Sequence, residues 1–200
     1  MALKRSLLIP LITFALGLLA LGATFWLVVY PPAQQQSASR VPIGGPFRLT
    51  SHEGKPFTDA DLKGKPFAVF FGFTHCPEVC PTTLYDLTQD LAALGPDADK
   101  LRVAFITVDP EQDTPELMKT YLSSFDPRIV GLTGTTDEIA AVAKAYKIYH
   151  RKVPTDSGYT MDHSATIFLM DSKGDFYGTS NFQESAEIRR EKLRQLIKNR

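Results

Sequence analysis

The chain has 200 residues with 22 basic and 22 acidic side chains, so its formal net charge at pH 7 is zero. Domains that bind nucleic acid usually carry a basic face, and this balance argues against nucleic acid as a partner. The sequence contains two cysteines, Cys76 and Cys80, which stand close together and suit a structural disulfide, a redox couple or a soft-metal site.

The first part of the chain predicts a membrane anchor. Residues 7–30 contain no charged side chain. This uncharged run is longer than the roughly 20 apolar residues that a transmembrane helix needs, and longer than the roughly 7–15 apolar residues of a cleavable signal peptide. Lys4 and Arg5 flank the near end, so the N-terminus is expected in the cytoplasm and the rest of the chain outside. The small residues Gly22 and Ala23 leave cleavage as an alternative.

The remainder divides into a spacer and one domain. Residues 31–46 are rich in Pro, Gln, Ser and Gly, a composition typical of a flexible or partly extended tether. Without the two basic residues of the anchor, 20 basic (22 − 2) and 22 acidic side chains remain, a formal charge of −2. We therefore predict an anchor over residues 1–30, a linker over 31–46 and one compact domain with its own core over 47–200.

The domain begins with alternating strands and helices. Residues 67–72, FAVFFG, form a continuous apolar run, which is typical of a strand covered on both faces. Leucines at helical spacing predict a helix over residues 81–94, and residues 101–108 predict a second strand. Thr114 followed by Pro115 predicts the start of the next helix.

The second half of the domain continues the pattern and sets the expected fold class. Its predicted elements are a short strand over residues 129–132, a helix over 136–146 capped by Thr136, a strand over 165–170 that turns into a hairpin, and a final helix over 185–198. Residues 147–164 are predicted to be the longest irregular segment. Crossover helices imply a parallel central sheet, and the hairpin adds antiparallel strands, so we predict an α/β fold with a mixed sheet flanked by helices.

Both cysteines lie in residues 71–83, FGFTHCPEVCPTT, directly after the first strand. Reactive groups gather at the carboxyl ends of strands in such sheets. The spacing of Cys76 and Cys80 puts both sulfurs on one side of a helical turn, which suits a disulfide or a shared metal ion. The start of the following helix would stabilise thiolates, the form that attacks disulfides and binds metals. Two inert, buried cysteines are the alternative.

Of the four histidines, His163 is predicted to join the cysteines. It precedes a core strand that should neighbour the cysteine-bearing strand, so it enters the same end of the sheet. His52, His75 and His150 are interpreted as surface or peripheral residues. Two thiolates and one imidazole suit Cu(I) or Cu(II), whereas a structural zinc site takes four ligands and would need His75 or water.

Two acidic residues are candidates for supporting this site. Asp162 is predicted either to orient the imidazole of His163 or to bond the backbone. Asp109 follows the second strand at the same rim and is predicted to modulate a thiol pKa, to face a partner or to cap the Asp-Pro turn. The thioether of Met161 suits copper, but packing is the favoured interpretation.

Three segments, in this order, resemble the Sco/SenC family: FGFTHCPEVCPTTL, VDPEQDTPELMKTYLSSF and MDHSATIFLMD. The resemblance covers roughly residues 42–198 and implies a thioredoxin-like fold with a hairpin insertion. It also implies a copper site made of Cys76, Cys80 and His163. The implied role is to mature the binuclear copper centre of cytochrome c oxidase subunit II, with copper supplied by an upstream donor protein.

Two features depart from ordinary thioredoxins. Three residues rather than two separate the cysteines, and Ala165 stands where a cis-proline usually precedes the strand. Because a wider gap changes the geometry and the reduction potential of the pair, both features put general disulfide exchange in doubt.

The leading hypothesis is a copper metallochaperone tethered to the bacterial inner membrane, with its domain in the periplasm. A bacterial rather than mitochondrial location is expected because the chain starts at the anchor, without an Arg-rich presequence. The alternative is a thiol–disulfide reductase in which Cys76 and Cys80 are the redox pair that keeps a partner's cysteines reduced. A peroxiredoxin-like peroxidase is a weaker third hypothesis.

Overall fold

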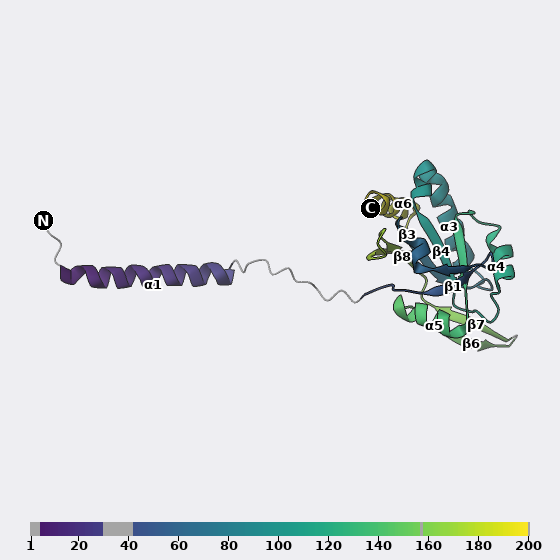
Figure 1. Cartoon of the computed structure of the whole chain (residues 1–200), viewed down its shortest axis with the longest axis horizontal. Coiled ribbons are helices and arrows are strands. Elements are labelled where there is room, and N and C mark those ends of the chain that lie inside the picture. The colour runs from purple at the N-terminus through teal and green to yellow at the C-terminus, as the bar shows by residue number, and fades with distance from the viewer. Residues whose placement is uncertain (1–4, 30–41, 157, 200) are drawn as a thin grey trace. The chain divides into compact units, whose positions relative to one another are not determined.

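The computed structural model describes residues 5–29, 42–156 and 158–199. The chain divides into two units, Met1–Val41 and Pro42–Arg200, and the first contains the helix α1 (Arg5–Val29) (Figure 1). Within the described part of the chain, no helix is both long and apolar enough to cross a membrane, so the predicted transmembrane helix is not confirmed. Most of the predicted linker lies outside the described residues.

The second unit is built on a seven-stranded mixed sheet. Its strands are β1 (Arg48–Ser51), β2 (Pro56–Thr58), β3 (Phe67–Gly72), β4 (Arg102–Thr107), β5 (Ile129–Thr133), β8 (Thr166–Met170) and β9 (Phe176–Asn181). Their order across the sheet is β2-β1-β5-β4-β3-β8-β9. The central strands β3, β4 and β5 are parallel, whereas β8 pairs antiparallel with β3. The predicted mixed α/β class is confirmed, and β8 is the neighbour of the cysteine-bearing strand.

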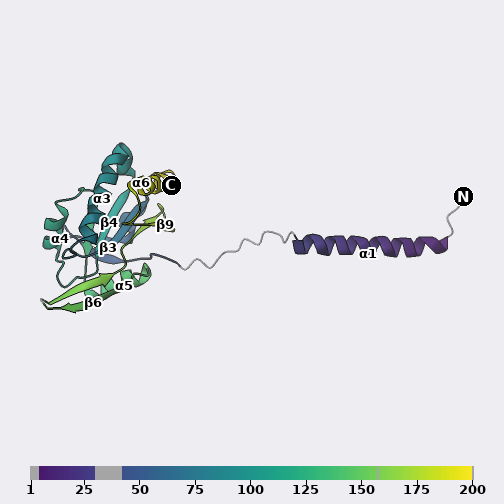
Figure 2. The ribbon, with the colours of Figure 1, turned by 180° about the vertical axis from the view of Figure 1, so that it is seen from behind.

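Helices cover both faces of this sheet. They are α2 (Asp59–Leu62), α3 (Val79–Leu94), α4 (Pro115–Leu122), α5 (Thr136–Ala145) and α6 (Ala186–Lys198), with a 3₁₀ helix η1 (Gly95–Lys100) after α3. Figures 1 and 2 show α3 and α6 on one side of the sheet and α5 on the other. Successive strand residues point to opposite faces. Phe70 accordingly stacks on Phe105, while Phe71 packs against Tyr146 at the end of α5.

Local capping explains where the helices begin. The Thr114 side chain accepts a hydrogen bond from the Leu117 amide, and Pro115 is the first helical residue, as predicted. The predicted cap at Thr136 is wrong by one residue. Thr135 caps α5, because its side chain accepts a hydrogen bond from the Glu138 amide. The Glu138 carboxylate in turn accepts a hydrogen bond from the Thr135 amide at 2.8 Å, which completes a reciprocal capping box.

The segment predicted to be irregular, residues 147–164, instead forms a second sheet. β6 (His150–Thr155) pairs antiparallel with β7 (Gly158–His163), separately from the central sheet. Such a hairpin is difficult to predict because only one of its faces is covered, so its sequence is mostly polar. The resemblance to the Sco/SenC family implies a hairpin insertion of this kind.

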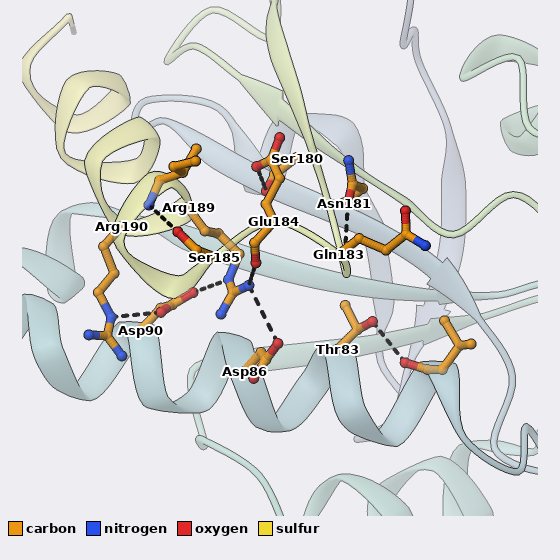
Figure 3. A network of polar contacts seen from close by, with 12 residues as sticks. Thr83, Asp86, Asp90, Ser180, Asn181, Gln183, Glu184, Ser185, Arg189 and Arg190 are labelled. Carbon is orange, nitrogen blue, oxygen red and sulfur yellow. Dashed lines mark hydrogen bonds and ion pairs between the residues drawn. The ribbon is translucent and has the colours of Figure 1, made fainter.

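A buried ionic network joins α3 to α6 (Figure 3). The carboxylate of Asp90 is fully buried and accepts hydrogen bonds from Arg189 and, at 2.9 Å, from Arg190. Arg189 is 3% exposed, and it also donates to the Glu184 carbonyl and pairs with Asp86 at 3.4 Å. Because a buried charge is costly unless it is paired, these contacts fix α6 against the helix that carries Cys80.

We expect Arg189→Ala to lower the free energy of unfolding by roughly 2–4 kcal/mol, because the buried carboxylate of Asp90 loses one of its two partners. Arg194→Ala, on an exposed part of the same helix, should change it by less than about 0.5 kcal/mol. Urea denaturation followed by circular dichroism measures both. Equal effects of the two substitutions would contradict a stabilising role for the network.

Candidate metal centre

Cys76, Cys80 and His163 lie together beyond the carboxyl end of β3. The two sulfurs and one imidazole nitrogen are all within 4.8 Å of one another. Among the described residues, no other group of three or more His, Cys, Asp or Glu side chains is close enough to share a metal ion. Neither cysteine is in a disulfide, and Cys76 is half-buried whereas Cys80 is fully buried.

The position of Cys80 depends on a glycine in the strand beneath it. α3 begins at Val79, two residues earlier than predicted, so Cys80 lies in its first turn and packs on β3 at Gly72. A Cβ atom at Gly72 would lie 2.8 Å from the sulfur of Cys80 and 2.7 Å from Cε2 of Phe105, closer than packed atoms approach. Only glycine allows this approach, because it has no side chain.

Cys76 precedes α3, and its sulfur lies at the positive end of the helix. The backbone amide of Cys80, which has no partner within the helix, donates to the sulfur of Cys76 at 3.4 Å. A hydrogen bond from the Cys80 thiol lowers the pKa of Cys76 to about 4 against the opposing effect of burial. The same hydrogen bond and burial raise the pKa of Cys80. At neutral pH the pair therefore holds a half-exposed thiolate and a buried thiol.

His163 is the last residue of β7 and is oriented by two neighbours. Its Nδ1 lies 3.0 Å from the carbonyl oxygen of Ser164, and its ring meets the edge of Phe73 with centroids 5.7 Å apart. Because a carbonyl only accepts hydrogen bonds, Nδ1 carries the proton and Nε2 presents a lone pair. Nε2 lies 3.5 Å from the sulfur of Cys80, so the imidazole is already set to coordinate a metal.

The two acidic candidates are placed very differently. Asp162 is exposed and faces Arg151 at 3.8 Å, on the side of β7 opposite to His163. The prediction that it orients the imidazole is wrong, because adjacent strand residues point to opposite faces and the Ser164 carbonyl has that role. Asp109 is buried at the rim, where it accepts hydrogen bonds from the hydroxyl of Tyr159 at 3.0 Å and from Gln112 at 2.9 Å.

Sequence reasoning missed one buried carboxylate beside the site. Asp113 is fully buried and accepts hydrogen bonds from the amide of Thr74 at 3.1 Å and from the hydroxyls of Thr74 and Thr107, both at 2.5 Å. Burial raises its pKa. The available signal was its place four residues after Asp109 in the second family motif, which joins it to the rim of the sheet.

The other histidines and Met161 lie outside the cluster. His75 is exposed, with Nδ1 at 3.2 Å from the Thr74 hydroxyl. His52, predicted at the surface, is half-buried and accepts a hydrogen bond from the Gly131 amide at 2.9 Å, which joins it to β5. His150 lies opposite His163 in the hairpin. Met161 is buried in the hydrophobic core.

We expect iodoacetamide to alkylate Cys76 at a nearly constant rate between about pH 8 and pH 6, because alkylation requires the thiolate. The rate should halve near pH 4, where the pKa of Cys76 lies. Cys80 should remain unmodified in the folded protein because it is buried. Mass spectrometry of the digested protein measures each site. A Cys76 alkylation rate that already falls steeply between about pH 9 and pH 6, as for an ordinary thiol, would contradict the lowered pKa.

Most of the chain is similar to one known protein family. A model of the SCO1/SenC family matches residues 35–198. "Protein SCO2, mitochondrial" of Saccharomyces cerevisiae is 44% identical over 163 residues, which is 78% of this chain and 54% of that protein. "Protein SCO1 homolog, mitochondrial" of Homo sapiens is 40% identical over 150 residues, 72% of this chain and 49% of that protein. The chain thus spans about half the length of these relatives.

Solved structures share the fold of the second unit. Bradyrhizobium japonicum ScoI with copper bound is 53% identical, with a TM-score of 0.73, over 77% of this chain and 99% of that one. Yeast Sco1 with copper bound is 36% identical, with a TM-score of 0.73, over 80% of this chain and 90% of that one. The thioredoxin-like fold expected from the sequence is therefore confirmed.

Proposed function

The chain belongs to the SCO1/SenC family, and we propose that it is a copper metallochaperone whose cargo is held by Cys76, Cys80 and His163. The observation that carries this proposal is the convergence of two sulfurs and one imidazole nitrogen within 4.8 Å. Thiolates suit Cu(I), and an added imidazole also accommodates Cu(II). Three protein ligands do not complete the four that structural zinc takes.

The uneven exposure of the three ligands supports transfer rather than permanent storage. Cys80 is fully buried, whereas Cys76 and His163 are half-buried. A ligand from a partner protein can therefore approach the metal on the side of Cys76 and His163. Copper would then move by ligand exchange, with each new bond to the partner replacing one of these.

The family resemblance and the sequence support a proposal for the destination of the copper and for the location of the protein. We propose that the partner is cytochrome c oxidase subunit II, whose binuclear copper centre receives the metal, and that an upstream protein supplies it. The absence of charge over residues 7–30 supports a membrane anchor. Lys4 and Arg5 before it support a cytoplasmic N-terminus and a periplasmic domain.

A second function is favoured by the asymmetry of the two thiols. The Cys76 thiolate can attack a partner's disulfide, forming a mixed disulfide and releasing one partner thiolate. Cys80 then loses its proton and attacks the sulfur of Cys76, which releases the second partner thiolate and leaves a Cys76–Cys80 disulfide. Two electrons pass to the partner, and an external dithiol must reduce the pair again. Such a reaction would also prepare a partner's cysteines for metal.

We expect the reduced protein to bind one copper ion, and His163→Ala to weaken Cu(II) binding by more than about 100-fold because it removes a ligand. Cys76→Ser/Cys80→Ser should abolish binding. His150→Ala is the matched control, because His150 lies opposite His163 in the hairpin but outside the cluster. Competition with a chelator under anaerobic conditions measures each affinity, and wild-type affinity in His163→Ala would refute the three-ligand site.

The second function predicts a different pattern. Reduction of a disulfide in a test peptide should be lost in Cys76→Ser, which removes the attacking thiolate, but should be retained within about threefold in His163→Ala. Stopped-flow measurement of thiol release distinguishes the variants. No detectable reduction by the wild-type protein would leave copper transfer as its sole proposed activity.

A further inference from the structure

We propose that Thr74 and Tyr159 are positioning residues for the copper ligands, because the loop between β4 and α4 anchors both of them through buried carboxylates. The inference rests on the proposed function, since it assigns these residues to the same three-ligand site. Asp113 of this loop holds the segment that carries the cysteines. Asp109 of the same loop holds the strand that carries His163.

The first contact fixes the approach to Cys76. Thr74 lies two residues before this cysteine, and both its amide and its hydroxyl donate to Asp113, at 3.1 and 2.5 Å. Thr107, at the end of β4, donates to the same carboxylate at 2.5 Å. The cysteine segment is thereby connected to β4 as well as to its own strand. The same segment contains a turn, in which the Cys76 amide donates a hydrogen bond to the Phe73 carbonyl at 3.3 Å.

The second contact fixes the strand that ends in His163. Tyr159, Met161 and His163 occupy alternate positions of β7 and so share one face. Tyr159 donates to Asp109 at 3.0 Å, Met161 is buried, and His163 reaches Cys80. A two-stranded hairpin is only marginally stable by itself, so its position depends on contacts of this kind.

Lys152 of β6 adds a contact to the same loop. Its ammonium group pairs with Glu111 at 2.5 Å and lies 4.5 Å from the centre of the Tyr159 ring. Lys152 and Glu111 are both largely exposed, and exposed pairs contribute little to stability. The partly buried hydrogen bond from Tyr159 to the buried carboxylate of Asp109 is therefore the stronger connection between the hairpin and the loop.

The two carboxylates belong to one compact turn. The amide of Asp113 donates to the carbonyl of Asp109 at 3.0 Å, and the amide of Asp109 donates to the Thr107 hydroxyl at 2.9 Å. Cys80 and His163 are 83 positions apart in the sequence. The segments that carry them are nevertheless both hydrogen-bonded to this turn. Because the oxygens of Asp109 and Asp113 already accept hydrogen bonds from protein donors, these residues position the site rather than bind the metal.

The first test is Tyr159→Phe in the 200-residue chain, which removes only the hydroxyl that donates to Asp109. Cu(II) affinity should fall roughly two- to tenfold, the effect of one hydrogen bond. The spectrum of bound Cu(II) should also change, because the imidazole is less well held. Tyr85→Phe is the matched control, since this tyrosine is 58% exposed on α3 and the substitution removes the same atom. Equal effects of the two substitutions would overturn the role of Tyr159.

A second test separates the two contacts by means of Cu(I), which the two thiolates can bind without His163. In a His163→Ala background, Tyr159→Phe should have no further effect because it acts through the imidazole. Thr74→Val acts through the cysteine segment, so it should weaken Cu(I) binding roughly two- to tenfold in either background, while Thr74→Ser should retain wild-type affinity. A full effect of Tyr159→Phe in the His163→Ala background would show a merely structural role and overturn the inference.

The metal-free protein provides a test that does not depend on copper. Imidazole ¹⁵N resonances of His163 should shift and broaden in Tyr159→Phe and remain unchanged in Tyr85→Phe. Unchanged His163 resonances in both variants would overturn the positioning role even if copper binds as proposed. Conversely, if the variants show this response but the wild-type protein fails to bind copper, the proposed function is refuted and the positioning of His163 by Tyr159 stands.

Discussion

The close packing of α3 on β3 at Gly72 is the contact on which the site depends. It brings the sulfur of Cys80 to the place where a side chain on the strand would otherwise lie. The same approach directs the amide of Cys80, in the first turn of α3, at the sulfur of Cys76, so helix polarity acts on that sulfur. The ion pairs between Asp90 and the arginines of α6 hold the far part of α3 in this position. The strand, the helix and the ion pairs together make Cys76 a half-exposed thiolate and Cys80 a buried thiol.

Copper binding and disulfide exchange use the thiolate of Cys76 and the thiol of Cys80 in different ways. Exchange needs one accessible thiolate and one thiol in reserve, which Cys76 and Cys80 supply without any third group. Copper binding needs both sulfurs as ligands, and the buried thiol must lose its proton to serve as one. The imidazole of His163, with its lone pair directed at Cys80, is useful chiefly for the metal. The presence of a preset third ligand therefore favours copper as the main cargo of this site.

The sequence predicts the ligands better than it predicts their surroundings. Cys76 and Cys80 follow the apolar strand β3 and His163 precedes the apolar strand β8. The adjacency of these two strands follows from the α/β pattern, so the meeting of the three ligands is foreseeable. The pairing of β6 with β7 was missed because its residues are mostly polar, and with it the fact that Asp162 faces outward. The buried Asp113 was missed because its role depends on Thr74, 39 positions away in the chain. Contacts of this range have no local signature.

The separation of the β6–β7 hairpin from the central sheet has a consequence for how the protein can evolve. Two ligands lie on the rigid sheet-and-helix core, whereas His163 lies on a small sheet with few backbone connections to it. Local opening of such a peripheral unit requires far less free energy than global unfolding. The lifetime of the bound metal and the melting temperature of the domain are therefore separable traits. Selection acting on hairpin residues can adjust how quickly cargo departs in one lineage or another while the core remains unchanged.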